Sequence, residues 1–380
     1  MTNKLQQIHP SIAIVHEWLS IIAGSEKVVS ELLALYPNAD LFTLVDFFND
    51  EERTLVHGKR AQTSFIQHLP FAKTSFRTYL PLMPLAIEQF DVSKYDIVIS
   101  SHHAVAKGVL THQNQLHLCY CHSPMRYAWD FYHEYLREAK LDKGLKGMVA
   151  KLMLHYLRVW DVATANRVDA FIANSHYIAR RIKRIYNREA TVIYPPVDVE
   201  QFSLNTKKQE YYLAVARFVP YKKVDVILNA FSKMLDKKLV LIGEGDKSLL
   251  KHATRNIEVL GFQPFESLKH YLSNAKAFVY AAEEDFGITI VEAQACGTPV
   301  IAFGKGGATE TVIDKQTGLL FHEQTPESLI NAINTFEQME FDYAHIRRNA
   351  ERFSRTVFAE TIKTFIDENY QAFLQTISSH

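Results

Sequence analysis

Two glutamates, Glu284 and Glu292, flank a turn between a predicted strand and a predicted helix in EEDFGITIVEAQACGTPVIAFGKGGATE, residues 283–310. The apolar run AFVYAA before the turn predicts a buried strand, and ITIVEAQAC predicts the helix. Gly297 stands where a helix commonly stops in a left-handed residue. Because a carboxylate offers two acceptor oxygens, each glutamate is suited to binding the neighbouring hydroxyl groups of a sugar ring.

The start of this helix, at Phe286, Gly287 and Ile288, is a predicted anion site. Free backbone N–H groups and a partial positive charge make a helix N terminus attractive to phosphate. Glu292 would lie about 7 Å along the axis, at ~1.5 Å per residue, which is comparable to the length of a pyrophosphate. We therefore expect a diphosphate at the helix start, a ribose at Glu292 and a sugar at Glu284.

A scaffold for these residues follows from the repeated order of strand, turn and helix. Such alternation implies parallel sheets covered on both faces, with ligands beyond the carboxyl ends of the strands. The double proline Pro195-Pro196 interrupts the series, and a second series starts near residue 211. Gly243 in the segment IGEG would give the backbone room beside a nucleotide, although a plain turn explains it nearly as well.

The fold class expected is α/β, with two doubly wound, Rossmann-like domains facing a cleft. Residues 1–195 would form the first domain and residues 196–355 the second. Residues 356–380 show helical periodicity and would form a closing helix that crosses back to the first domain.

Composition excludes several classes of protein. Lysine plus arginine equals aspartate plus glutamate, at 42 each, and no nucleic-acid-binding motif accompanies the bases, so nucleic acid is not an expected partner. The three cysteines cannot form a disulfide framework, and Cys119 and Cys121 are expected in a buried strand. The start MTNKLQQIHP has no apolar core of a cleavable signal, and no apolar run approaches the ~20 residues of a membrane span. We expect a cytoplasmic protein, at most peripheral at the inner face of the cell membrane.

Basic and aromatic side chains gather in two segments. Residues 53–87 contain five basic side chains and no acidic one, and residues 143–158 have a similar amphipathic character. Such a mixture suits an anionic membrane surface or a lipid-pyrophosphate acceptor. A helix face packed on the core is an equally good interpretation.

The spacing of Glu284 and Glu292, together with the flanking FG, ACGTPV and GG elements, resembles the signature of family 4 retaining glycosyltransferases. The resemblance covers nearly the whole chain and implies the two-domain GT-B fold, with an acceptor-binding domain in residues 1–195 and a nucleotide-sugar-binding domain in residues 196–355. VARFVPYKKVD is similar to the arginine and lysine pair of the family, which implies Arg217 and Lys222 on the donor diphosphate. The family commonly has glycine after the lysine, where this chain has Lys223.

The N-terminal half carries further resemblance. HEWLSIIAGSEKV is similar to the first strand, turn and helix of the family, which implies that Gly24 approaches the donor. CHSPMRYAWD and SSHHAVAKGV resemble loops of a bacterial mannosyltransferase-like branch. Carried over, His122 would lie over the transferred sugar and Arg126 would touch phosphate or acceptor, while His103 and Lys107 are expected to be structural.

The resemblance implies transfer of a hexose with retention at the anomeric carbon, without metal or cofactor. It suggests mannose from GDP-mannose and a glycan or lipid-linked oligosaccharide acceptor in surface polysaccharide synthesis. Two alternatives stay open: a GT-B-fold nucleotide-sugar epimerase, and a non-catalytic sugar-nucleotide-binding subunit of a larger complex.

Overall fold

The structure is a computed structural model that describes residues 10–378. The opening segment MTNKLQQIH, where no signal is expected, lies outside the described residues. The chain divides into two compact units, which are described separately. Unit 1 comprises Met1–Ile193 with Ala359–His380, and unit 2 comprises Tyr194–Phe358.

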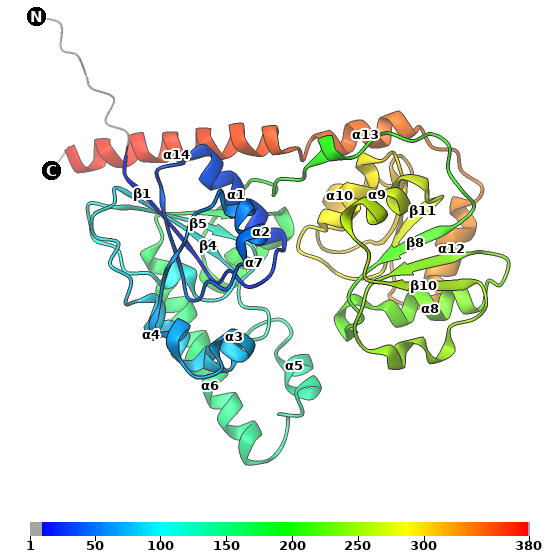
Figure 1. Cartoon of the computed structure of the whole chain (residues 1–380). Coiled ribbons are helices and arrows are strands. Elements are labelled where there is room, and N and C mark those ends of the chain that lie inside the picture. Colours follow the sequence, from blue (N-terminus) through cyan, green and yellow to red (C-terminus); the bar gives the residue numbers. More distant parts are fainter. Residues whose placement is uncertain (1–9, 379–380) are drawn as a thin grey trace, which may run out of the picture. The chain divides into compact units, whose positions relative to one another are not determined.

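Unit 1 is built on a parallel sheet of seven strands in the order β3-β2-β1-β4-β5-β6-β7 (Figure 1). Along its centre Ile14 pairs with Leu41 on one side and with Ile99 on the other. The strands are β1 (Ile12–His16), β2 (Asp40–Thr43), β3 (Gln62–Thr63), β4 (Ile97–His102), β5 (Leu116–Cys121), β6 (Ala170–Ala173) and β7 (Ala190–Val192).

The helices of unit 1 follow the strands as the sequence predicts. Ser175 caps α7 by accepting a hydrogen bond from the backbone N–H of Ile178 at 3.1 Å. Cys119 and Cys121 are buried and free in β5, as expected. The helices are α1 (Gly24–Leu35), α2 (Asp50–Arg53), α3 (Ala72–Ser75), α4 (Met83–Ile87), α5 (Tyr132–Glu138), α6 (Gly144–Thr164) and α7 (His176–Tyr186).

Unit 2 repeats the plan with six parallel strands in the order β10-β9-β8-β11-β12-β13. Side chains alternate between two apolar layers: Leu213 and Phe278 pack with α10 on one face, and Tyr212 and Val279 pack with α8 on the other. The strands are β8 (Tyr212–Val215), β9 (Leu239–Ile242), β10 (Ile257–Gly261), β11 (Ala277–Tyr280), β12 (Val300–Phe303) and β13 (Gly318–Phe321). The helices are α8 (Val224–Ser232), α9 (Phe265–Asn274), α10 (Ile288–Ala295), α11 (Ala308–Thr311), α12 (Pro326–Phe336) and α13 (Tyr343–Glu351).

The last helix, α14 (Arg355–Ser378), is the long red helix of Figure 1. Phe358, Ile362 and Ile366 are buried, one turn apart, in agreement with the predicted apolar stripe. Among residues 10–378 no helix is both long and apolar enough to cross a membrane.

Strand order reverses once in each sheet, between β1 and β4 and between β8 and β11. At such a switch point the loops after the two strands diverge and leave a crevice at the carboxyl edge of the sheet, where ligands of these folds bind. In each unit, ligand-binding residues are therefore expected in the loops that follow these two strands.

A buried ion pair joins α6 to the loop after β4 in unit 1. The ammonium of Lys107 lies 2.7 Å from the carboxylate of Asp161, and both side chains are fully buried. Asp161 also accepts hydrogen bonds from the indole of Trp129 at 2.8 Å and the hydroxyl of Tyr186 at 3.0 Å. Lys107 donates in addition to the hydroxyl of Thr164 at 2.7 Å. Lys107 is therefore structural, as the sequence analysis expects.

Four histidines in unit 1 are held neutral by burial. The pKa values of His103 and His117 fall to about 4, chiefly because burial disfavours the charged ring. The pKa values of His102 and His122 are lowered for the same first reason. His117 is fully buried, with Nε2 2.9 Å from the Ser100 hydroxyl and Nδ1 3.0 Å from the Arg167 carbonyl.

Removing Asp161 should destabilise unit 1 strongly. In Asp161→Leu the ammonium of Lys107 stays buried without its counter-ion, so we expect a loss of about 3–5 kcal/mol in the free energy of unfolding. The three tryptophans, Trp18, Trp129 and Trp160, all belong to unit 1, so tryptophan fluorescence in urea reports on this unit. The double variant Lys107→Met/Asp161→Leu removes both charges of the pair and should regain at least about 1 kcal/mol. Equal stability of Asp161→Leu and the double variant would contradict a stabilising role of the ion pair.

The buried histidines should make unit 1 less stable as pH falls. Their pKa is lower in the folded than in the unfolded chain, so their contribution is complete above about pH 6.5 and is lost as pH falls toward 4. For His117 the loss amounts to about 3 kcal/mol. Paired carboxylates lose their contribution only below their ordinary pKa, so the window from pH 6.5 to 4.5 isolates the histidines. The urea midpoint should fall as the pH is lowered from 6.5 to 4.5, and it should fall less steeply in His117→Gln. An equally steep fall in this variant would contradict the assignment of the pH dependence to the buried histidines.

Candidate functional site

In unit 2, the turn that contains Glu284 is fixed by a pair of glycines. The carbonyl of Glu284 accepts a hydrogen bond from the N–H of Gly307 at 2.7 Å. A Cβ on Gly306 would lie 2.2 Å from that carbonyl oxygen, and a Cβ on Gly307 would lie 2.3 Å from the Cα of Phe286. The GG element therefore allows the loop after β12 to lie directly against the turn after β11, which sets the position of Glu284.

The helix α10 begins where the sequence predicts. Gly287 precedes it in the left-handed region, with φ +88°, and no side chain caps the helix. Gly287 and Ile288 are partly exposed, so their backbone can meet an anion. The side chain of Phe286, by contrast, is buried against Tyr194 and Phe353. Only the backbone of Phe286 is available to a ligand.

Lys222 is brought into contact with Glu284. Its ammonium lies 2.5 Å from the Glu284 carboxylate and 3.2 Å from the hydroxyl of Tyr280, which ends β11. Lys223 adopts the left-handed conformation, with φ +53°. This conformation favours glycine, which explains why glycine suits this position in similar sequences. Lys222, and not its neighbour, faces the turn.

The loop of Arg217 is shaped by the glycines that follow β9. A Cβ on Gly243, at φ +143°, would lie 1.8 Å from the carbonyl oxygen of Ala216. A Cβ on Gly245 would lie 2.5 Å from the carbonyl oxygen of Phe218. These glycines let the two loops pair around Arg217, which is exposed and donates to the Tyr221 hydroxyl at 2.8 Å. The role of Gly243 seen here is this close backbone approach.

Glu292 lies in the second turn of α10, and its side chain is largely buried, with 8% exposed. At ~1.5 Å per residue its Cα lies about 6 Å along the axis from the helix start. In unit 2 the structure thus brings Lys222 and Glu284 into direct contact at the ends of β8 and β11, with Glu292 further along the helix that follows.

In unit 1, Glu17 is a residue that motif analysis missed. It follows β1 directly and is fully buried, and its carboxylate accepts backbone N–H groups of residues 103–106 at 2.7–3.1 Å. Burial alone would raise its pKa, but a hydrogen bond with His102, the nearby His103 and these N–H groups bring the pKa of Glu17 far below its ordinary value. A lone acid at the end of a buried strand is the signal that could have identified it.

A chain of hydrogen bonds connects the Gly24 turn with His122. The carboxylate of Glu26 lies 3.2 Å from Nε2 of His16, whose Nδ1 lies 3.1 Å from the Ser101 hydroxyl. The same hydroxyl lies 2.8 Å from Nε2 of His122. Glu26 and His16 were also missed, because the next member of this chain of hydrogen bonds, Ser101, lies 85 residues after His16 and shows no spacing pattern with it. Glu26 also accepts the N–H of Ala23 at 2.9 Å.

Gly24 is the first residue of α1, and Glu26 binds the residue before it. Gly24 does not have a positive φ, so this position does not require glycine for its backbone conformation. Its contribution to a site would be an accessible backbone at the helix start. The pKa of Glu26 is lowered: burial alone would raise it, but the hydrogen bond and electrostatic attraction of His16 together with the nearby His103 outweigh burial. An ionised carboxylate therefore forms the first member of this chain of hydrogen bonds, next to Gly24.

His122 and Arg126 lie in a loop that is braced by the segment after β6 and by α7. Asn174 donates to the carbonyl of His122 at 3.0 Å, and Arg181 of α7 donates to the Ser123 hydroxyl at 2.9 Å. Burial and the nearby histidines keep the pKa of His122 well below its ordinary range, so the ring is neutral near pH 7. Arg126 is partly exposed and lies over the ring of Phe131, 5.9 Å from its centroid.

Two family models match the chain. The model "Glycosyltransferase Family 4" matches residues 22–201, and the model "Glycosyl transferases group 1" matches residues 197–353. Together they extend over both units.

Similar proteins carry glycosyltransferase names. An uncharacterized glycosyltransferase of Methanocaldococcus jannaschii is 32% identical over 205 residues, 51% of this chain and 58% of that protein. The human GDP-Man:Man(3)GlcNAc(2)-PP-Dol alpha-1,2-mannosyltransferase is 30% identical over 200 residues, 44% of this chain and 41% of that protein. The chain thus spans about half the length of these relatives.

Solved structures share the fold. HepE from Anabaena, solved in complex with UDP and glucose, matches with a TM-score of 0.69 at 19% identity, covering 94% of this chain and 100% of that one. The sucrose-phosphate synthase of Thermosynechococcus elongatus matches with a TM-score of 0.70 at 17% identity, covering 96% and 100%. With the family models on both units and two Rossmann-like sheets that match such enzymes, the chain belongs to glycosyltransferase family 4 and has the GT-B fold.

Proposed function

We propose that the chain transfers a hexose from a nucleotide sugar, with retention at the anomeric carbon. The contact of Lys222 with Glu284 beside the uncapped start of α10 carries the proposal. It places a cation, an acceptor of hydroxyl hydrogen bonds and free backbone N–H groups at the switch point of unit 2. A nucleoside diphosphate sugar presents the complementary groups, namely phosphates and sugar hydroxyls.

The donor would be divided among these groups. The diphosphate would bind Arg217, Lys222 and the backbone at Gly287, while Glu292 would bind the ribose and Glu284 the transferred sugar. The cations would neutralise the charge that develops on the leaving diphosphate, without a metal ion or a further cofactor. A donor phosphate would compete with Glu284 for Lys222, which frees the carboxylate for hydroxyl groups.

Retention would follow from attack on the face that the phosphate leaves. The leaving phosphate would take the proton of the acceptor hydroxyl, and the protein would supply position and charge stabilisation. Because His122 is neutral near pH 7, it would act as a hydrogen-bond partner of the sugar. Arg126 would contact phosphate or acceptor, and Gly24 would approach the donor through its backbone.

Mannose from GDP-mannose is the donor that we propose first. In addition to the human enzyme, a relative from Corynebacterium glutamicum, 30% identical over 186 residues, is named as a GDP-mannose-dependent monoacylated alpha-(1-6)-phosphatidylinositol monomannoside mannosyltransferase. That match covers 40% of this chain and 49% of the relative. The acceptor would be a glycan or a lipid-linked oligosaccharide of surface polysaccharide synthesis, met at the cytoplasmic face of the membrane. HepE was solved with UDP-glucose, so the base and sugar require a direct test.

The two glutamates should affect different kinetic constants. Glu292→Ala removes a charged hydrogen-bond acceptor, so the KM for the donor should rise by about 10- to 100-fold with little change in kcat. Glu284→Ala should lower kcat by about 100-fold, because its contacts with the transferred sugar position the reacting carbon. Its affinity for a nucleoside diphosphate should not fall, since Lys222 then has no competing carboxylate.

Glu283→Gln, at the adjacent glutamate, is the control and should keep both constants. Lys222→Ala should lower kcat, whereas Lys223→Gly should retain activity because it leaves the left-handed backbone unstrained. Steady-state kinetics with the donor identified below would measure these effects. Unchanged constants in both Glu284→Ala and Glu292→Ala would overturn the assignment.

A panel of nucleotides and nucleotide sugars should identify the donor. GDP and GDP-mannose should raise the Tm of the protein, and UDP, UDP-glucose and UDP-galactose should not, because a bound ligand stabilises the folded state. Product analysis by NMR should then show a new α-linked mannoside. Stabilisation by UDP-sugars alone would refute GDP-mannose, an epimerised nucleotide sugar would favour the epimerase, and binding without turnover would favour a non-catalytic subunit.

A further inference from the structure

The helix α6 packs one face on unit 1 and leaves an apolar face uncovered. Leu157, Asp161 and Thr164 are buried on the inner face. The outer face exposes Leu145 by 73% and Leu152 by 58%. The exposed apolar side chains recur three or four residues apart, which places them along one side of the helix; they are Leu145, Met148, Val149, Leu152, Tyr156 and Val159.

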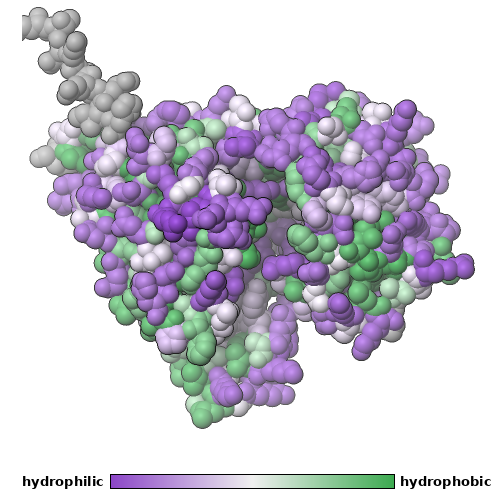
Figure 2. Space-filling model, viewed as in Figure 1, coloured by the Kyte–Doolittle hydropathy of each residue, from purple (hydrophilic) through white to green (hydrophobic). Residues whose placement is uncertain are grey.

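Positive charge flanks this outer face. Residues 140–158 contain five lysines and arginines and a single acid, Asp142. Four of them are exposed at the surface, namely Lys140, Lys143, Lys146 and Lys151. In Figure 2, hydrophobic side chains gather at the lower tip of the unit that contains α6, with hydrophilic ones beside them. An exposed apolar stripe bordered by lysines is complementary to an anionic membrane surface.

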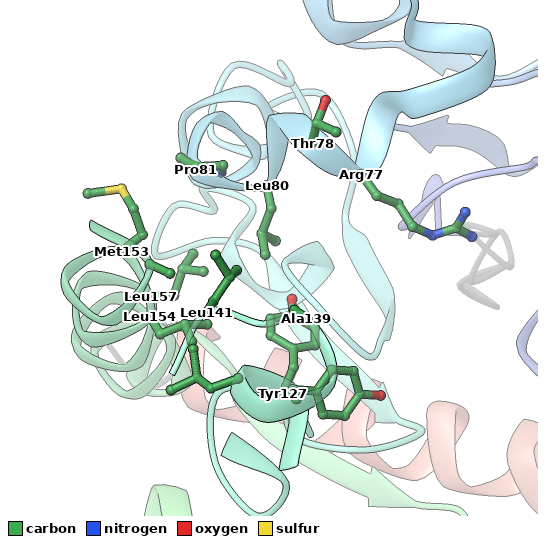
Figure 3. A pocket seen from close by; sticks show the side chains of 13 residues that line it. Arg77, Thr78, Leu80, Pro81, Tyr127, Ala139, Leu141, Met153, Leu154 and Leu157 are labelled. Atoms are coloured by element: carbon green, nitrogen blue, oxygen red, sulfur yellow. The ribbon is translucent and has the colours of Figure 1, made fainter. Parts of the chain in front are cut away.

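Behind α6 lies a cavity of about 360 Å³ with apolar walls. Its size falls within the range of about 300–1,000 Å³ that small-molecule sites occupy. Leu80, Leu141, Leu154 and Leu157 converge on it in Figure 3, whereas the guanidinium of Arg77 points away. Because the walls are almost entirely apolar, they suit a hydrocarbon chain better than a sugar or a nucleotide.

Tyr127 is one of the few residues with a polar group that line the same cavity. Its hydroxyl is buried and makes no hydrogen bond within residues 10–378. A buried hydroxyl without a partner is unfavourable, so a ligand atom that accepts or donates there is favoured. Tyr127 belongs to the loop of His122, which links the cavity to the candidate site of unit 1 through the chain.

We propose that the outer face of α6 docks on an anionic membrane and that the cavity behind it holds the hydrocarbon chain of a phosphate-bearing lipid. The polar end of the lipid lies toward Tyr127. That this lipid is the lipid-linked acceptor rests on the proposed function; the binding itself does not.

The cavity is tested with dodecyl phosphate below its critical micelle concentration. It should raise the Tm, followed by tryptophan fluorescence, by about 5–10 °C at a hundredfold excess over its Kd, and inorganic phosphate should not. Ala150→Phe fills the cavity from α6 and should abolish the shift. If that variant does not fold, Ala139→Phe fills the same space from an exposed position. An equal Tm shift in the filled variant, or no Tm shift in the wild type, refutes the proposal that the cavity holds the hydrocarbon chain.

The docking face is tested by flotation with vesicles. The protein should bind vesicles that contain phosphatidylglycerol, less so at high salt, and should not bind pure phosphatidylcholine. Leu152→Glu should lower this binding more than tenfold, while Leu235→Glu, at an apolar residue of unit 2 that is 53% exposed, should not. If Leu152→Glu binds the vesicles as well as the wild type does, the proposal that the outer face of α6 docks on the membrane is refuted.

Transfer to a water-soluble glycan separates this inference from the proposed function. Ala150→Phe should keep that transfer while it loses the binding of dodecyl phosphate, since a water-soluble acceptor has no hydrocarbon chain to place in the cavity. Absence of transfer in every protein would refute the function and leave the lipid measurements valid. Transfer in the wild type without any lipid binding would refute only the inference.

Discussion

The reversal of strand order at the centre of each sheet is the constraint on which the candidate groups depend. There the loops after two neighbouring strands leave in opposite directions, and no helical connection covers the strand ends. In unit 1 the loops after β1 and β4 meet through Glu17, which binds the N–H groups of residues 103–106. In unit 2 the loops after β8 and β11 meet through Lys222 and Glu284. Each unit thus holds a charged side chain of one loop against the other loop at the same topological position.

The two units treat these charges differently. Glu17 is fully buried and satisfied by backbone donors, and Lys107 and Asp161 neutralise each other in the interior nearby. An ion without its partner is very costly there, so these groups fix the loop after β4 in one conformation. Lys222 and Glu284 retain exposed surface, with 17% and 15% of their side chains accessible. Water and a ligand can reach them, so their pairing can be exchanged for contacts with phosphate and hydroxyl groups.

The sequence predicts the parts of this arrangement that depend on neighbours in the chain. The left-handed Gly297, the start of α10 and the apolar stripe of α14 were all predictable from local patterns, and the structure confirms them. The family motif also predicted the fold. Its GG element has a structural reason, because only glycine allows the loop after β12 to lie against the backbone of Glu284. Glu17 and Asp161 were not predicted, because their partners lie far away in the chain. Phe286 was predicted as a ligand contact from its place in the motif, whereas its side chain belongs to the core.

The hydrogen-bond chain that ends at His122 has a direction set by its first member. The ionised Glu26 can only accept, so Nε2 of His16 carries a proton. In the neutral tautomer of His16 that carries its proton on Nε2, Nδ1 accepts from the Ser101 hydroxyl, whose oxygen then accepts from Nε2–H of His122. The remaining nitrogen of His122, Nδ1, presents a lone pair. A neutral acceptor is matched to a sugar hydroxyl and not to a phosphate, which agrees with the place proposed for His122 over the transferred sugar and not at the diphosphate.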